Sequence, residues 1–192
     1  MALLTGSNKI KTVVFISGTG SNLKSLIKFS KYKKSPIIIK MIISNNHKAK
    51  GLQYAKIYKI KKKVLDFKNT LSEKKIINKL KKKNINLICL AGFMKILSKS
   101  FVKNFKGKIL NIHPSLLPKY KGLNTHERAI RNKDKYSGCT VHFVNSRLDS
   151  GKIINQKKVR INKLDTPETL AKKILTQELK LYPAAIKKVL SI

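Results

Sequence analysis

The residues best suited to chemistry lie in the segment Asn111-Ile112-His113-Pro114-Ser115-Leu116-Leu117-Pro118. Asn111 and His113 are two residues apart, so in an extended segment their side chains point to the same side. An amide donor beside an imidazole suits the stabilisation of an oxyanion and the movement of a proton. A histidine beside a proline-rich turn is also a common structural residue, and the spacing alone leaves both interpretations open.

Acidic residues are scarce, with only eight in the chain, so each one stands out. Asp149 follows the segment that contains His142, where a carboxylate could orient an imidazole and stabilise its charge. It is equally well placed as a turn residue, because aspartate before Ser-Gly is favoured in turns. Glu178 lies on or beside the apolar face of a helical pattern, where a partly buried carboxylate needs a partner. A lysine of this chain and the amine or hydroxyls of a substrate are both candidates.

A glycine-rich turn, Gly18-Thr19-Gly20-Ser21-Asn22, lies between an apolar strand pattern and a helical one. Such a turn exposes backbone N–H groups at the positive end of the helix, which suits an anion such as a phosphate. It lacks the third glycine of the dinucleotide fingerprint and the Gly-Lys-Ser/Thr ending of a P-loop. The alternative is an ordinary strand-to-helix turn in which Ser21 or Asn22 caps the helix.

Other kinds of site find little support. Ser115 has no nucleophile-elbow motif, and the two cysteines, Cys89 and Cys139, have no flanking base and sit in apolar stretches. We interpret both as buried thiols in a reducing compartment. The four histidines show no pair at the spacing of a helical metal site, so we expect no metal. No secretory or membrane-spanning pattern is visible, which predicts a cytoplasmic protein without a membrane partner.

The formal net charge is +36, with 44 Lys and Arg residues on 192. Arginine is the residue that most often hydrogen-bonds base edges and phosphates, and it occurs only at positions 128, 131, 147 and 160. The lysines are spread over the whole chain. This pattern is more typical of a compositional bias than of a selected binding face. We therefore expect small-molecule substrates and no specific nucleic-acid partner, although a nucleic-acid-binding module stays as an alternative that would explain the charge.

Apolar, β-branched runs alternate with helical patterns along the chain, which favours an α/β fold with a parallel sheet covered by helices on both faces. Strands are predicted at 12–16, 37–43, 64–65, 85–91, 108–110, 140–144 and 153–161, and helices after 22, at 49–57, at 72–83 and from 167 onward. Pro183 is expected to kink or end the last helix. The length fits a single domain, 1–192, with a Rossmann-like, mostly parallel sheet.

Four segments together resemble the phosphoribosylglycinamide formyltransferases, a folate-dependent family. They are Ile-Ser-Gly-Thr-Gly-Ser-Asn-Leu at 16–23, Leu-Ala-Gly-Phe-Met-Lys-Ile-Leu-Ser at 90–98, Leu-Asn-Ile-His-Pro-Ser-Leu-Leu-Pro at 110–118 and Gly-Cys-Thr-Val-His-Phe-Val at 138–144. The likeness runs in order from about residue 11 to residue 190. It implies transfer of a formyl group from 10-formyltetrahydrofolate, as cosubstrate, to the amine of glycinamide ribonucleotide in purine synthesis, by a monomer or weak homodimer.

The resemblance also implies roles for individual residues. Asn111 and a protonated His113 would stabilise the oxyanion, and Asp149 would keep His113 charged and help to shuttle a proton. The nucleotide would be bound by Gly20, Ser21, Asn22, Thr176, Gln177 and Glu178, and the folate by Asn69, Met94, Lys95, Ile96, Leu97, Asn145, Ser146, Arg147 and Leu148.

Two departures from the family pattern bear on folate affinity. Asn124 stands where relatives often carry a histidine, and Asn69 or Lys68 stands where an arginine often contacts the folate. Methionyl-tRNA formyltransferase and formyltetrahydrofolate deformylase share the catalytic motif, but each normally carries an additional domain that we do not find in this sequence.

Overall fold

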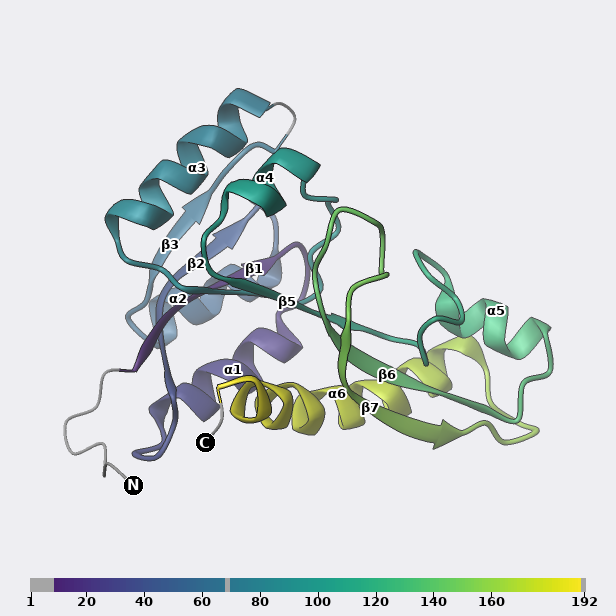
Figure 1. Cartoon of the computed structure of the whole chain (residues 1–192). Coiled ribbons are helices and arrows are strands. Elements are labelled where there is room, and N and C mark those ends of the chain that lie inside the picture. Colours follow the sequence, from purple (N-terminus) through teal and green to yellow (C-terminus); the bar gives the residue numbers. More distant parts are fainter. Residues whose placement is uncertain (1–8, 68–69, 191–192) are drawn as a thin grey trace, which may run out of the picture.

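The structure is a computed structural model that describes residues 9–67 and 70–190 (Figure 1). Within this part of the chain, seven strands form one sheet in the order β3-β2-β1-β4-β5-β6-β7. The strands from β1 to β5 run parallel, whereas β6 and β7 are antiparallel to their neighbours. Their bounds are β1 Ile10–Ile16, β2 Ile37–Ser44, β3 Lys61–Val64, β4 Leu87–Leu90, β5 Lys108–His113, β6 Tyr136–Phe143 and β7 Ile153–Arg160.

The central strands are apolar on both faces because each face is covered. In β1, Val14 and Ile16 join one buried cluster, whereas Val13 and Phe15 join the other. Alternating residues of a strand point to opposite faces, so an unbroken apolar run supplies both clusters at once. The predicted α/β fold with a mostly parallel sheet and helices on both faces is confirmed.

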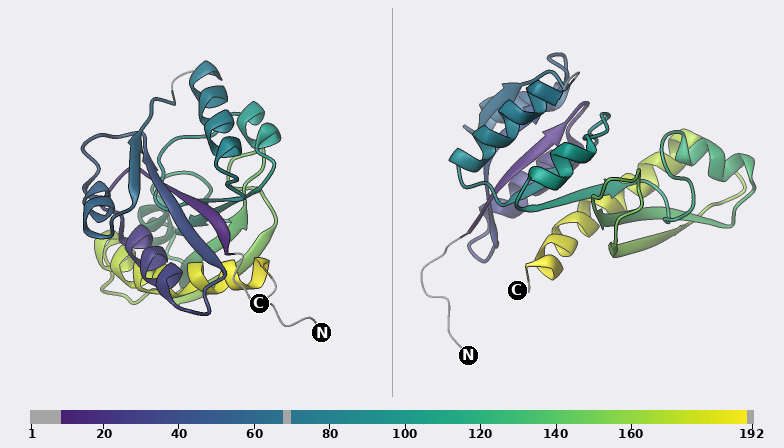
Figure 2. Two further views of the ribbon diagram at one scale, coloured as in Figure 1. Left: turned by 90° about the vertical axis from the view of Figure 1, so that its left-hand side faces the viewer. Right: turned by 45° about the horizontal axis from the view of Figure 1, so that its top comes forward.

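The helices divide between the two faces of the sheet (Figure 2). Buried residues of α1, α2 and α6 belong to one cluster, together with Ala129 of α5, and those of α3 and α4 belong to the other. The bounds are α1 Ser21–Lys31, α2 Gln53–Ile57 after a short 3-10 turn η1 Lys50–Leu52, α3 Thr70–Lys82, α4 Lys99–Asn104, α5 Thr125–Arg131 and α6 Pro167–Val189.

Several predicted boundaries were wrong. The strand predicted at 108–110 continues to His113, because its last residues pair with β6. The strand predicted at 85–91 is shorter, Leu87–Leu90, and the helix at 49–57 is divided into η1 and α2. Helices α4 and α5 were not predicted; they have six and seven residues, too short for a clear helical period.

Pro183 does not end the last helix, contrary to one of the two expectations for it. Helix α6 continues six residues past it, to Val189. Proline has no N–H, so the carbonyl of Leu179, four residues earlier, loses its usual helical donor. The Ser25 hydroxyl of α1 donates to this carbonyl at 2.7 Å. A side chain from the neighbouring helix thus satisfies the carbonyl that Pro183 leaves without a donor.

Candidate active site

The loops that follow β1 and β4 lie side by side at the carboxyl ends of these neighbouring strands. The N–H of Ser17 donates to the carbonyl of Gly92 at 3.0 Å, and the N–H of Met94 donates to Ser17 Oγ at 2.7 Å. The strand order reverses here, since β1 is followed by β2 on one side while β4 lies on the other. Ligands of open α/β sheets bind at this kind of reversal point. The glycine-rich turn and the 94–97 segment therefore lie at the end of the sheet where ligands of this kind of fold bind.

Asn111 lies within β5, directly opposite His142 of β6 in the antiparallel ladder. Its Nδ2 is 3.2 Å from His142 Nε2. The other ring nitrogen of His142, Nδ1, is 2.8 Å from the Phe143 carbonyl, to which it must donate. In the neutral ring, Nε2 is then an acceptor, so it receives one hydrogen of the Asn111 amide. This contact orients the amide and leaves its second hydrogen for a substrate oxygen.

His113, the last residue of β5, is buried and contacts acceptors through both ring nitrogens. Its Nε2 is 2.9 Å from the Tyr120 carbonyl, and its Nδ1 is 3.4 Å from Asp149 Oδ2. Because a carbonyl only accepts, Nε2 carries a hydrogen and Nδ1 is the nitrogen free to exchange a proton.

Burial lowers the pKa of His113, while the hydrogen bond to Tyr120 and the charge of Asp149 act in the opposite direction; His142 and Arg128 lower the pKa further. We expected Asp149 to keep this ring charged. The charge of Asp149 does favour the protonated ring, but the desolvation of the buried ring has the larger effect, so the neutral ring is favoured in the free protein.

Asp149 connects the catalytic candidates to one another. Its backbone is in the left-handed region, at φ 43°, in the loop between β6 and β7. Oδ2 accepts the N–H of Gly122 at 2.9 Å, and Oδ1 is 3.6 Å from His142 Nε2. Burial acts to raise the pKa of Asp149, but the contacts with His142, Gly122 and His113 outweigh it and lower the pKa. Asp149 is thus an ionised carboxylate between two imidazoles.

The glycine-rich turn opens α1, the 11-residue helix Ser21–Lys31. Gly20 is the residue before its first turn, at φ 80°, and no side chain caps the helix. The alternative interpretation, in which Ser21 or Asn22 caps the helix, is therefore wrong. The uncapped first turn leaves backbone N–H groups for an anion. Gly51 packs against this turn and donates its N–H to the Gly18 carbonyl at 2.9 Å.

Within the protein, Glu178 of α6 is bonded by Asn22 of this turn and not by a lysine, which was one of the two candidates named from the sequence. Asn22 Nδ2 donates to Glu178 Oε2 at 2.7 Å, and both side chains are buried. Burial raises the pKa of Glu178, and the hydrogen bond from Asn22 acts against this rise. Asn22 Oδ1 is buried without a hydrogen-bond partner, which marks a place for a donor from a ligand.

The neighbours of Glu178 on α6 are placed differently. Thr176 is exposed and its hydroxyl donates to the Lys172 carbonyl of the same helix at 3.1 Å, and Gln177 is half-buried. Of the three residues of α6 predicted to bind the nucleotide, Glu178 is the one whose side chain is hydrogen-bonded to the glycine-rich turn, through Asn22.

Exposed apolar side chains occur in the two segments predicted to bind folate. Met94 and Ile96 are 64% and 74% exposed, and Leu148 is 49% exposed. Lys95, Asn145, Ser146 and Arg147 are also at the surface. Leu97 differs from its neighbours, because its side chain is buried in the core cluster of α3 and α4. Asn69 lies outside the described residues.

Sequence reasoning did not assign roles to His142 or Tyr120, although both contact the predicted catalytic residues. His142 could have been found only with the β5–β6 register, which pairs it with Asn111. Tyr120 contributes its backbone carbonyl, and because every residue has one, the residue type at this position could not indicate the contact.

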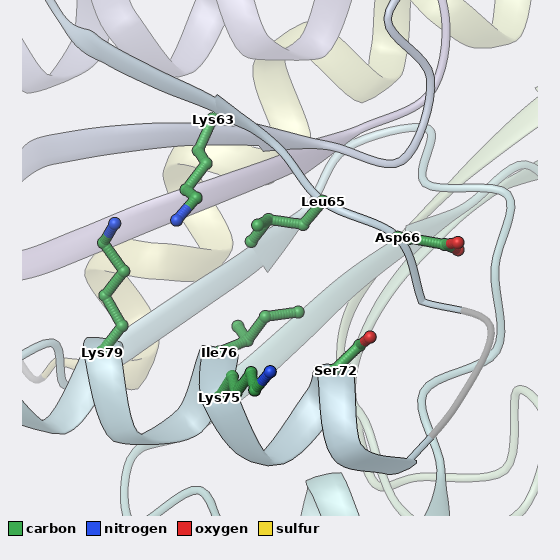
Figure 3. Close-up of a pocket in the computed structure, with 7 residues that line it drawn as sticks. All are labelled: Lys63, Leu65, Asp66, Ser72, Lys75, Ile76 and Lys79. Atoms are coloured by element: carbon green, nitrogen blue, oxygen red, sulfur yellow. The ribbon is translucent and has the colours of Figure 1, made fainter.

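A separate pocket of about 160 Å³ lies between β3 and α3 (Figure 3). Lys63 and Lys79 reach toward each other across it. Contact with Lys63 lowers the pKa of Lys79. The lining residues include none of the predicted catalytic residues, so this pocket is separate from the chemistry proposed below.

Residues 9–67 and 70–190 were also considered as sites for a metal ion or a membrane. No group of three or more His, Cys, Asp or Glu residues is arranged to hold a metal ion. In the same residues, no helix is both long enough and apolar enough to cross a membrane.

Comparisons with known proteins agree on one family. The formyl transferase family model matches residues 10–186. Phosphoribosylglycinamide formyltransferase of Haemophilus influenzae is 45% identical over 92% of this chain and 85% of its own length. The crystal structure of phosphoribosylglycinamide formyltransferase from Brucella melitensis is 40% identical, with a TM-score of 0.89 over 95% of this chain and 96% of that chain. The trifunctional purine biosynthetic protein adenosine-3 of Gallus gallus is 43% identical over 96% of this chain, which spans only 19% of that larger relative.

Proposed function

The chain belongs to the formyl transferase family, among the phosphoribosylglycinamide formyltransferases, and from this premise we propose that it transfers a formyl group from 10-formyltetrahydrofolate to the amine of glycinamide ribonucleotide. The products are formylglycinamide ribonucleotide and tetrahydrofolate. The observation that carries the proposal is the cluster of Asn111, His113 and Asp149 beside the ligand-binding end of the sheet.

The nucleotide binds at the glycine-rich turn in this proposal. The uncapped first turn of α1, with Gly20 and Ser21, takes the phosphate, because its free N–H groups and the helix dipole favour an anion. Asn22 and Glu178 bind donors of the same substrate. Asn22 Oδ1 has no partner in the protein, so a substrate hydroxyl or amine supplies the missing hydrogen bond. Thr176 and Gln177 complete this side of the site.

The folate binds over the exposed apolar side chains. A pterin ring and its aromatic linker are flat and largely apolar, and they would cover surface at Met94, Ile96 and Leu148 that is otherwise in water. The remaining residues of these two segments that we assign to folate are Lys95, Leu97, Asn145, Ser146 and Arg147, with Asn69 outside the described residues. Leu97 is buried in the core, so its role is to hold this segment in place and not to contact the folate with exposed surface.

The reaction begins when the neutral amine attacks the formyl carbon, which forms a C–N bond and places negative charge on the formyl oxygen. Asn111 donates the second hydrogen of its Nδ2 to this oxygen. Protonated His113 donates from Nδ1, since Nε2 is used by Tyr120. Burial disfavours this charged ring in the free protein, but the developing oxyanion and Asp149 both favour it.

The tetrahedral adduct then breaks its bond to the folate nitrogen. A proton must move from the attacking nitrogen to the leaving one, and Asp149, as an ionised carboxylate next to His113, is placed to pass it through a water molecule. Holding the two substrates together supplies much of the remaining acceleration. The buried free thiols Cys89 and Cys139 support a reducing compartment, so we propose that the reaction takes place in the cytoplasm.

The experiment is a spectrophotometric assay of 10-formyl-5,8-dideazafolate turnover with and without glycinamide ribonucleotide. We expect deformylation only with the nucleotide, and we expect it to vanish in His113→Ala. His47→Ala is the matched control, because His47 is an exposed histidine outside the cluster of Asn111, His113 and Asp149. Turnover without the nucleotide would identify a deformylase. Absence of turnover, with salt-sensitive binding to RNA, would favour the nucleic-acid alternative.

A further inference from the structure

The carbonyl that holds the His113 ring belongs to a residue with an unusual backbone. Tyr120 has φ 56°, in the left-handed region that side chains other than glycine seldom adopt. Its carbonyl accepts from His113 Nε2 at 2.9 Å and lies 3.4 Å from Ser115 Oγ. A residue keeps this conformation only where its surroundings hold it.

The side chain of Tyr120 has partners at its hydroxyl and at its ring. Tyr120 Oη donates to Asp134 Oδ2 at 2.7 Å and accepts from Asn132 Nδ2 at 2.8 Å. Lys119 Nζ lies 5.2 Å from the centre of the ring and the Arg128 guanidinium 4.9 Å from it. Lys119 Nζ also pairs with Asp134 Oδ1 at 2.6 Å. The tyrosine is therefore fixed at its hydroxyl and at its ring.

We propose that Asp134, acting through Tyr120, is a positioning residue that fixes the orientation and the tautomer of His113. The chain of contacts runs from the Asp134 carboxylate to the Tyr120 hydroxyl, through the tyrosine to its own carbonyl, and from there to His113 Nε2. A hydrogen held on Nε2 leaves Nδ1 toward Asp149 and the substrates. This inference rests on the catalytic role proposed above for His113.

The anchoring has a consequence for the titration of His113. The hydrogen bond to the Tyr120 carbonyl raises the pKa of His113 against the effect of burial. The other groups that act on the ring are Asp149, His142 and Arg128, and His126 lies near enough for His113 to lower its pKa. The hydrogen bonds and ion pair of the Asp134 carboxylate described above are with Lys119 and Tyr120, and with none of these groups. Loosening Tyr120 at its hydroxyl should therefore lower the pKa of His113 while these neighbours stay in place.

The test compares Tyr120→Phe, Asp134→Ala and the double variant with the unchanged chain. Tyr120→Phe removes one oxygen and keeps the ring beside Lys119 and Arg128. Each single change should lower kcat about ten-fold, because a small misplacement of a reacting group is costly, and should leave both KM values unchanged. The double variant should be no worse than either single one, since both break the same contact. The pKa of His113, followed by NMR of its ring, should fall in all three.

Asp165→Ala is the matched control, because Asp165 also pairs with a lysine, Lys173, at 2.7 Å and lies outside the proposed site. It should lower the unfolding temperature without changing kcat or the titration of His113. If Asp134→Ala does not fold, Tyr120→Phe carries the test. An unchanged kcat and an unchanged His113 titration in Tyr120→Phe would overturn the proposal, as would an equal loss in Asp165→Ala. The NMR titration needs no substrate, so it tests the positioning even if the proposed reaction is wrong.

Discussion

Replacing Gly51 by alanine should displace the loop that we propose binds the nucleotide phosphate. The new Cβ would lie 2.9 Å from Gly20 Cα, 2.8 Å from Ile16 Cδ1 and 3.2 Å from the Gly18 carbonyl oxygen. Carbon atoms in contact prefer separations of about 3.5–4.0 Å, so the two backbone segments must move apart by roughly 0.6–1 Å. The contact with Gly20 is the important one, because backbone cannot rotate away as a side chain can.

The size of the effect follows from what moves. Overpacking of this kind costs about 1–3 kcal/mol of folding free energy, which leaves a protein of this size folded. A displacement of about 1 Å at a substrate-positioning loop can cost a factor of about 100. Because we propose that this loop binds the nucleotide phosphate and not the reacting atoms, we expect this loss chiefly as a higher KM for glycinamide ribonucleotide. The KM for the folate donor should change little.

Steady-state kinetics with each substrate varied in turn will measure both KM values. Gly18→Ala is the comparison within the same loop, because a Cβ there meets nothing within 4 Å; it should keep the stability of the unchanged chain. A folded Gly51→Ala protein with an unchanged KM for the nucleotide would refute the reasoning. So would equal changes in the two KM values, since they would place the disturbance at the folate side as well.

Three further predictions use the titratable groups. Burial raises the pKa of Glu178 above its unfolded value, so its contribution to stability is present below the unfolded pKa and is lost as pH rises through the folded pKa. Glu178→Gln should therefore stabilise the fold by about 1 kcal/mol at neutral pH and give no such gain in acid, where Glu178 itself is protonated; urea unfolding at the two pH values will measure both. The same variant should bind the nucleotide more weakly. Asp149→Asn should lower kcat about 100-fold and lower the pKa of His113, which Asp149 now raises; the pH–rate profile will reveal both changes. Burial raises the pKa values of Cys89 and Cys139 to about 12, so a thiol reagent should modify them only in urea, and rapid reaction of the native protein would contradict their burial.

The layered fold could be predicted because its signal is local. A run such as Val13 to Ile16 supplies both buried clusters, and Ile76 and Leu80 on α3 repeat at helical spacing, so each element shows its own pattern. The mostly parallel sheet then follows from the alternation of such elements. The short helices α4 and α5 escaped prediction because fewer than two turns give no period to recognise.

The site was predictable only as far as residue types indicate chemistry. Asn111, His113 and Asp149 could be named, and the family resemblance assigned them roles. The partner of Glu178 could not, because Asn22 is 156 residues away and the pair depends on how α6 packs on α1. The contact of Asn111 with His142 depends on the register between two antiparallel strands, which a slip of one residue would abolish.

The strand order leaves β3 and β7 at the two outer edges of the sheet. An outer strand has one row of backbone N–H and C=O groups without a neighbouring strand, and such an edge can pair with the same edge of another molecule. β3 carries Lys61, Lys62 and Lys63 in succession, and β7 carries Lys157 and Lys158. Two molecules that approached edge to edge would bring these ammonium groups together, and their repulsion opposes growth of a shared sheet. The lysines on these two strands should therefore oppose aggregation of this chain through its sheet edges at high protein concentration.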